Sequence, residues 1–98
     1  MLLREVVEEL SFTRTLVSLS SKYPRIEDVK QTIDWNVAKD PQRFDRVPGV
    51  PDGYVLRTTP IGDTPSFKVW FRYSEEEPGK VYLAAIAEVP QESATGES

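Results

Sequence analysis

The segment Phe67-Lys-Val-Trp-Phe-Arg-Tyr73 alternates between two kinds of side chain. Its first, third, fifth and seventh residues are aromatic or aliphatic, whereas Lys68, Trp70 and Arg72 occupy the positions between them. Because successive side chains of a strand point to opposite faces of a sheet, this pattern predicts one face in the core and one face outside it. We therefore expect Tyr73 in the core and a basic, aromatic surface on the opposite side of the sheet.

Three further strands are predicted around this segment. Tyr54 to Thr59 precedes it, and Val81 to Val89 follows it and is apolar enough to lie at the centre of a sheet. The turn-forming stretch Glu75-Glu-Glu-Pro-Gly79 predicts an antiparallel hairpin between the last two strands. Residues 2–9 are short and rich in branched side chains, which predicts an edge strand at the beginning of the chain.

Two helices are predicted between the first and second strands. Ser11 is a candidate N-cap for the first helix, which Pro24 ends. The second helix follows after about two residues and ends at Asp40-Pro41, so the pair should form an antiparallel hairpin. The apolar faces at helical spacing are Phe12, Leu16, Leu19 and Tyr23 in the first helix, and Ile26, Val29, Ile33 and Val37 in the second.

This order of elements predicts an α+β domain of the form β-α-α-β-β-β over residues 1–90. The helical hairpin is expected to pack on one face of a small, mainly antiparallel sheet and to leave the other face free to bind a partner. Residues 41–53 contain three Pro and two Gly, which predicts an ordered loop. Residues 91–98 have no large apolar side chain and are expected to form a flexible acidic tail.

Composition excludes several classes of function. The chain has 98 residues, 12 basic and 16 acidic side chains, a net charge of −4, and neither Cys nor His. Disulfide scaffolds, thiol nucleophiles, Ser-His-Asp hydrolases and zinc hydrolases are therefore excluded. The longest apolar run, Val81 to Ala87, is far shorter than the roughly 20 residues that span a membrane. Arg4, Glu5, Glu8 and Glu9 stand where a secretory signal would be apolar, so we expect a soluble, cytoplasmic protein without a membrane partner.

Charge is unevenly distributed along the chain. Residues 74–98 contain six Glu and one Lys, whereas residues 51–73 contain three basic and two acidic side chains. Affinity for a nucleic-acid backbone comes largely from Lys and Arg that displace its counterions. The mildly basic middle of this chain therefore does not predict tight, unaided binding to nucleic acid.

Several motifs occur in a fixed order. Pro48-Gly-Val-Pro-Asp-Gly-Tyr-Val-Leu-Arg57 combines a Gly-x-Pro-Asp turn with a Tyr and a basic strand. The alternating strand 67–73, an acidic turn and the last strand follow it, and Ser11-Phe-Thr-Arg14 and the Tyr23-Pro24 break precede it. Together these motifs resemble the RelE/ParE superfamily, the toxin subunits of bacterial type II toxin–antitoxin pairs, over residues 2–89.

The resemblance implies an activity and a set of site residues. RNA-cleaving members enter the ribosomal decoding site and promote attack of an mRNA 2′-hydroxyl on the adjacent phosphate. Arg57 and Lys68 match basic residues of that family, and together with Arg72 they are the candidate catalytic residues. The implied partners are a cognate antitoxin, the ribosome and mRNA, and no cofactor or metal is implied. The alternative interpretation of these three residues is solvated charge on an open sheet face.

Trp70, Arg43 and Arg46 are the candidate RNA-binding residues. Trp70 shares a strand face with Lys68 and could stack on a base, or it could simply cover sheet surface. Arg43 and Arg46 lie in the loop 41–53.

The chain also departs from the RNA-cleaving pattern, which leaves two functions open. Val55 and Glu88-Val89 stand where that branch has basic residues, and neither Tyr nor His follows Tyr82. Glu88 would oppose catalysis by like-charge repulsion if it faced the phosphate. The first function is a ribosome-dependent mRNA endonuclease with a divergent active site. The alternative is a ParE-like or degenerate protein-binding module without RNase activity, with gyrase as a target.

Overall fold

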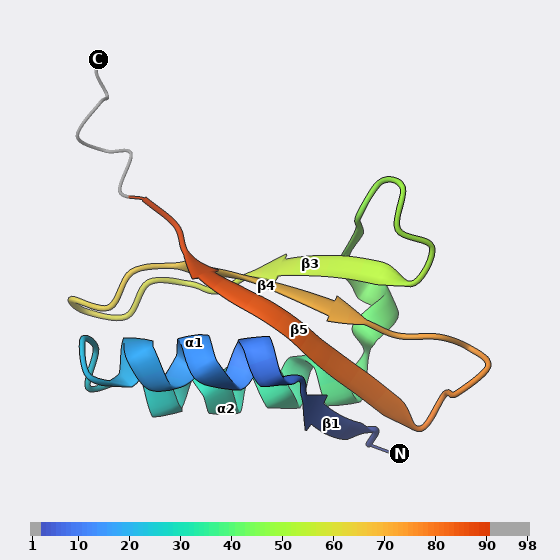
Figure 1. Cartoon of the computed structure of the whole chain (residues 1–98), viewed down its shortest axis with the longest axis horizontal. Coiled ribbons are helices and arrows are strands. Elements are labelled where there is room, and N and C mark those ends of the chain that lie inside the picture. The colour runs from blue at the N-terminus through green and yellow to red at the C-terminus, as the bar shows by residue number, and fades with distance from the viewer. Residues whose placement is uncertain (1–2, 91–98) are drawn as a thin grey trace.

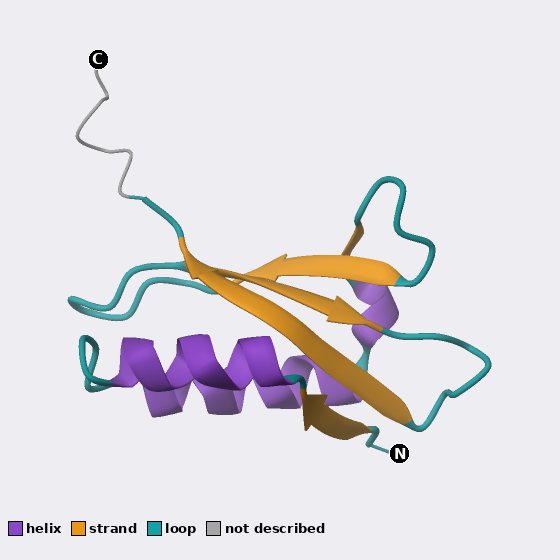
Figure 2. Ribbon diagram, in the orientation of Figure 1, coloured by secondary structure: helices purple, strands orange, loops and turns teal. Residues whose placement is uncertain are grey.

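A computed structural model describes residues 3–90 of the chain and shows two helices on one face of a five-stranded sheet (Figures 1 and 2). The predicted α+β fold with a helical hairpin is confirmed. The predicted tail at 91–98 lies outside the described residues. The elements are β1 (Glu5–Glu8), α1 (Leu10–Ser20), α2 (Ile26–Lys39), the 3₁₀ helix η1 (Pro41–Arg43), β2 (Asp45–Arg46), β3 (Gly53–Arg57), β4 (Phe67–Arg72) and β5 (Lys80–Glu88).

The strands lie in the order β1-β5-β4-β3-β2, so β5 is an interior strand and β1 an edge strand, as expected. The pairs β2–β3, β3–β4 and β4–β5 are antiparallel, and β1 runs parallel to β5. The sheet is therefore mixed, although mainly antiparallel. The segment expected to be only a loop, 41–53, also contributes η1 and the two-residue edge strand β2.

The core lies between the helices and the sheet (Figure 2). The alternation in β4 is confirmed, because its core-facing side chains and Tyr73 are at most 5% exposed. The helices bury the predicted faces at Phe12 and Leu16 in α1 and at the four predicted positions in α2. No helix within residues 3–90 combines the length and the apolar character needed to cross a membrane.

The beginning of α1 differs from the prediction. The helix starts at Leu10, and Glu9 holds the N-cap position without a side-chain hydrogen bond to the helix. Ser11 is therefore not the cap, and its hydroxyl instead donates to the carbonyl oxygen of Ala84 in β5 at 2.6 Å. The helix also ends at Ser20, before the predicted end, so Tyr23 packs against the core from the connection between the helices.

The partner of Ser11 lies at an irregularity in β5. Trp70 pairs with Ala85, but its neighbour Phe71 pairs with Leu83, so Ala84 has no counterpart in β4. This extra residue is a β-bulge, which shifts the alternation by one position. Leu83 and Ile86 consequently both face the core, and the apolar run of β5 does not alternate along its length.

The loop before β3 is closed by backbone hydrogen bonds. The Val47 amide donates to the Gly53 carbonyl at 2.9 Å, and the Gly53 amide donates to the Val50 carbonyl at 3.0 Å. A Cβ atom at Gly53 would lie 2.6 Å from Cγ1 of Val50, so this close approach requires glycine. The loop is ordered as predicted, and it fixes where β3 begins.

Candidate functional site

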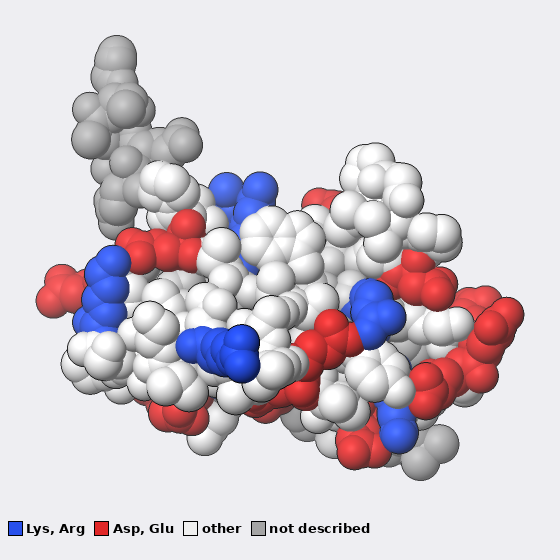
Figure 3. Space-filling model, in the orientation of Figure 1, with Lys and Arg blue, Asp and Glu red and all other residues white. Residues whose placement is uncertain are grey.

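The face of the sheet opposite the helices carries the predicted basic residues of β3 and β4. Arg57 pairs directly with Lys68, and two residues further along the strands Val55 pairs with Trp70. Both helices lie on the other side of the sheet, so neither covers this face (Figure 2). In the space-filling view, basic side chains rise from it at the end of β3 (Figure 3). We call the Arg57, Lys68 and Trp70 side chains on this face the basic face.

The two cations of the basic face lie opposite each other without a counterion. Arg57 and Lys68 are exposed, and neither forms an ion pair within residues 3–90. Like charges at directly opposed positions of an antiparallel pair destabilise a sheet. An anion held between the two side chains would remove that repulsion.

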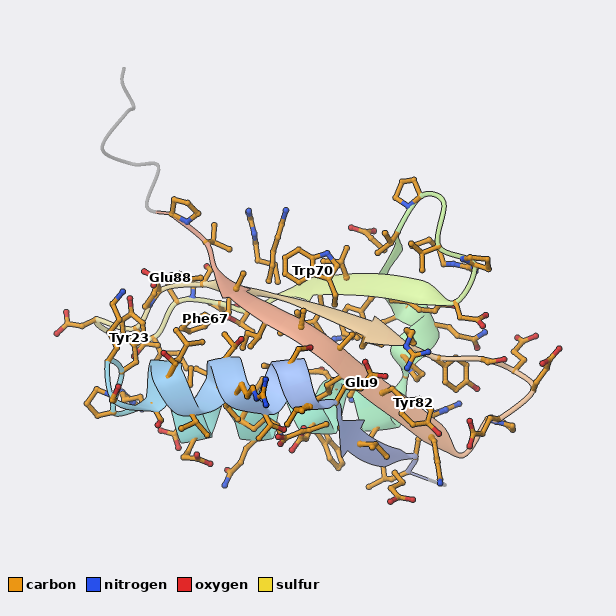
Figure 4. All side chains as sticks on the ribbon, in the orientation of Figure 1. Glu9, Tyr23, Phe67, Trp70, Tyr82 and Glu88 are labelled. Carbon is orange, nitrogen blue, oxygen red and sulfur yellow. The ribbon has the colours of Figure 1, made fainter. Side chains whose placement is uncertain are left out.

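Trp70 stands on the same face, beside the two cations. Its side chain points away from the helices (Figure 4), and it is half-buried between Val55 of β3 and Ala85 of β5 in the register of the sheet. These small or branched neighbours leave the indole partly accessible. Proteins that bind single-stranded nucleic acid combine an aromatic ring, on which a base stacks, with cations that contact the phosphates.

Arg72 shares this face but is separated from the other cations. It lies four residues after Lys68 in β4, about 13 Å away along an extended strand. Its guanidinium forms an ion pair with Glu9, and its central carbon lies 5.4 Å from the centroid of the Tyr82 ring. Figure 4 shows Glu9 and Tyr82 at the β1 side of the sheet. The structure therefore assigns Arg72 a carboxylate partner that sequence reasoning missed, because Glu9 is 63 residues away in the chain.

The hydroxyl of Tyr82, which lies on the same face, is also engaged in hydrogen bonds. Its hydroxyl donates to both carboxylate oxygens of Glu77 at 3.0 Å. The hydrogen bond with Glu77 raises the pKa of Tyr82, and partial burial and the negative charge of Glu77 act in the same direction. A phenol with a raised pKa is a poor general base near neutral pH.

Arg43 and Arg46 are not brought to the basic face. Arg43 donates to the side-chain oxygen of Asn36 in α2 at 3.0 Å. Arg46 donates to the Pro51 carbonyl, and its guanidinium carbon lies 5.0 Å from the centroid of the core-facing Tyr54 ring. Both arginines therefore lie at the β2 edge and on the helix side of the sheet, apart from Trp70.

Glu88 faces the helices and not the basic face. It pairs in register with the buried Phe67, and Figure 4 shows Tyr23, Phe67 and Glu88 together at the same end of the molecule. Its carboxylate accepts a hydrogen bond from the Tyr23 hydroxyl at 2.6 Å and one from Lys22 Nζ at 3.3 Å. The Tyr23 hydrogen bond, followed by the contacts with Lys22, lowers the pKa of Glu88 although burial opposes this. Glu88 therefore does not face an anion held at Arg57 and Lys68.

Metal binding has no support from the described part of the chain, where no group of three or more acidic side chains is arranged to hold an ion. The basic face thus combines two opposed cations, which form no ion pair within residues 3–90, with a half-buried indole. No protein-family model matches the chain, and no curated protein shows significant similarity to its sequence.

Proposed function

We propose that this chain is a RelE/ParE-like protein that binds single-stranded RNA across its basic face. The observation that carries the proposal is the opposed Arg57–Lys68 pair, which has no carboxylate partner within residues 3–90. A backbone phosphate between the two side chains would convert a repulsive pair into two charge-assisted hydrogen bonds.

The position of Trp70 supports a single strand as the ligand. A base can stack on the partly accessible indole only when the base is unpaired, and such stacking contributes about 1–3 kcal/mol per base. The net charge of −4 opposes long-range attraction to free RNA. We therefore propose mRNA presented by the ribosome as the ligand, because the ribosome would bring the strand to a protein that attracts it weakly.

The geometry favours binding over cleavage. Attack of a 2′-hydroxyl on a phosphate needs a group that accepts the nucleophile's proton and a group that protonates the leaving oxygen. On this face the Tyr82 hydroxyl is hydrogen-bonded to Glu77 and has a raised pKa, and Arg72 is paired with Glu9. Both groups would have to exchange partners before they could assist the reaction.

Binding can be tested by co-sedimentation with translating ribosomes. The variant Arg57→Gln/Lys68→Gln should bind at least tenfold more weakly than the wild type. A matched control, Arg14→Gln/Lys39→Gln, removes the same charge from exposed positions on the helices and should stay within twofold of the wild type. Equal losses in both variants would indicate a general effect of charge and would contradict the proposal.

Contact with RNA bases can be tested separately by fluorescence. The chain has two tryptophans, so the variant Trp35→Phe leaves Trp70 as the single reporter. We expect a single-stranded RNA cross-linked to the protein to quench this emission. A translating extract separates binding from cleavage. If the wild type leaves mRNA intact, the result supports binding alone. If the wild type cuts mRNA and the variant Arg57→Gln/Lys68→Gln does not, the result supports the endonuclease.

A second candidate function, protein binding without RNA contact, is favoured by one feature of α1. Leu10 and Val17 are each 64% exposed and lie two turns apart on the same side of the helix. An exposed apolar pair suits a protein target, which in the ParE-like alternative is gyrase. If this is the sole function, growth arrest caused by expression in bacteria should be lost in Val17→Asp and kept in Arg57→Gln/Lys68→Gln.

A further inference from the structure

The edge strand β1 directs half of its backbone groups away from the sheet. β1 runs parallel to β5, and the Glu5 amide donates to the Gly79 carbonyl at 2.8 Å. Because every second residue of β1 pairs with β5 in this way, the backbone groups of Val6 and Glu8 point to the opposite edge. No strand of residues 3–90 lies beyond that edge (Figure 1). Such an edge is a template for pairing with another strand.

A groove of about 460 Å³ lies beside this edge and is lined by residues of β1 and α2. Its lining includes Leu3, which precedes β1, Val6 in β1 and Trp35 in α2. Leu3 and Trp35 are each 51% exposed, although both side chains are large and apolar. Apolar surface next to a free sheet edge is typical of a surface that another chain covers.

Two buried side-chain atoms without a hydrogen-bond partner within residues 3–90 belong to the same groove. They are Nε of Arg4 and Oδ1 of Asp34. Another guanidinium nitrogen of Arg4 donates to the carbonyl oxygens of Ala38 and Lys39, at 3.2 and 3.1 Å. Arg4 forms no ion pair with any described residue. Because buried polar groups nearly always have partners, these two atoms indicate that the single chain leaves the groove incomplete.

We propose that β1 pairs antiparallel with β1 of a second copy of this chain, about a two-fold axis at Val6. A two-fold axis brings the same edge of each copy together and closes the assembly as a dimer. In this register Val6 lies opposite Val6 of the second copy, and Arg4 lies opposite Glu8 of the second copy on both sides of the axis. Opposite charges at directly opposed positions stabilise a sheet. This charge complementarity of β1 with itself is what selects a second copy as the partner.

The neighbouring registers lack this complementarity. An axis at Glu5 would place Glu5 opposite Glu5 of the second copy, and like charges directly opposite each other destabilise a sheet. An axis at Val7 would place Glu8 opposite Val6 and leave Arg4 opposite Leu10, which lies outside β1. Of these three registers, only the axis at Val6 opposes opposite charges on both sides.

The same register would supply what the groove lacks. Val6 packs against the core, on the helix side of the sheet, and opposed residues of an antiparallel pair point to the same face. Val6 of the second copy would therefore enter the groove beside Trp35. The Glu8 carboxylate lies 2.8 Å from Lys30 Nζ of its own chain, and its remaining lone pairs can accept from Arg4 of the other copy. The assignment is independent of RNA binding, because β5 separates β1 from the strands of the basic face.

Single-cysteine cross-linking tests the register, because the chain has no Cys of its own. The variant Val6→Cys brings two sulfurs together across the axis, where opposed Cα atoms would be about 5.5 Å apart, within the range of a disulfide. We expect this variant to form a disulfide-linked dimer at least tenfold faster than the control Val17→Cys, whose position on α1 is more exposed. Equal rates, or a Val6→Cys protein that stays monomeric under oxidation, would overturn the pairing.

Sedimentation velocity tests the association of the unmodified chain. Between micromolar and millimolar concentrations, the apparent mass of the wild type should rise toward that of two chains. Trp35→Asp and Arg4→Gln should each weaken the association at least tenfold, whereas the control Val17→Asp should stay within twofold. Circular dichroism of each variant confirms that it is folded. A wild type that remains monomeric at millimolar concentration, or an association that neither edge variant weakens, would overturn the proposal.

Discussion

At the scale of single residues, the Ser11 hydroxyl connects the first turn of α1 to the bulge of β5 through its hydrogen bond to Ala84. We expect Ser11→Ala to lower the free energy of unfolding by about 0.5–1.5 kcal/mol, the usual contribution of one hydrogen bond. Urea denaturation measures this. The control Ser18→Ala changes an exposed serine in the same helix and should be neutral or slightly stabilising. Equal effects in both variants would contradict a specific role for the Ser11–Ala84 contact.

The hydrogen bond from Tyr23 to Glu88 gives a second prediction at this scale. Because this bond is the largest cause of the lowered Glu88 pKa, Tyr23→Phe should raise that pKa toward the ordinary value of 4.5. An NMR titration of the Glu88 side-chain carbon in both proteins measures the change. Lys22→Gln should also raise this pKa, because it removes a hydrogen bond and a positive charge from Glu88. A Glu88 pKa unaffected by Tyr23→Phe would mean that the contact is not maintained in solution.

The sequence predicts the site residues only where local geometry decides their positions. Arg57, Lys68 and Trp70 share a face because alternation along each strand fixes the direction of its side chains. The pairing of Arg72 with Glu9 joins residues 63 positions apart, and nothing local indicates it. The sequence also did not indicate which face of the sheet Glu88 occupies, because the bulge at Ala84 reverses the alternation within the apolar run of β5.

At the scale of secondary-structure elements, Lys30 links α2 to β1. Its ammonium lies 2.8 Å from a carboxylate oxygen of Glu8 in β1 and 2.8 Å from one of Asp34 in α2. Burial alone would raise the pKa of Glu8, but hydrogen bonds from Lys30 and Thr13 lower it below 4.5. Burial likewise opposes the charge of Lys30, but Asp34 and Glu8 raise its pKa above 10.5.

These shifts define a pH window for the link between α2 and β1. A lowered carboxylate pKa stabilises the fold above about pH 4.5, and a raised lysine pKa stabilises it below about pH 10.5. Lys30→Met should therefore cost roughly 1.5–3 kcal/mol near pH 7, and less as the pH falls through the pKa of Glu8. Urea denaturation at pH 7 and pH 3 measures both values, with Lys39→Met as the control. A cost that does not depend on pH would contradict the electrostatic origin.

The elements themselves follow largely from the sequence, whereas their pairing does not. Periodicity predicted both helices and the strands β3, β4 and β5 to within a few residues, because burial of one face imposes the period. Periodicity could not predict that β1 runs parallel to β5, because the sequence of a short apolar strand does not indicate the direction of its pairing. The edge strand β2 has only two residues, so it is too short to show an alternating pattern in the sequence.

At the scale of the whole molecule, charge of the two signs gathers on different surfaces. The basic face carries Arg57 and Lys68, whereas acidic side chains gather at the turn between β4 and β5, which contains Glu75, Glu76 and Glu77 (Figure 3). The net charge of −4 hides this division. The acidic turn therefore lies apart from the two cations that the proposed RNA phosphate would contact.

The separation of stability from binding at the basic face gives the last prediction. Lys68→Glu replaces a repulsive cross-strand pair with an attractive one opposite Arg57, so it should stabilise the fold by about 0.2–1 kcal/mol at low salt. The gain should shrink when salt screens the pair, and the proposed RNA binding should be lost because the phosphate loses one cation and meets a carboxylate. Thermal unfolding at low and high salt and ribosome co-sedimentation measure the two effects.

The control Arg14→Glu changes the net charge equally at an exposed helix position and should alter neither property appreciably. A less stable Lys68→Glu protein would show that Lys68 supports the sheet, and a stabilised protein that still binds RNA would place the binding site elsewhere.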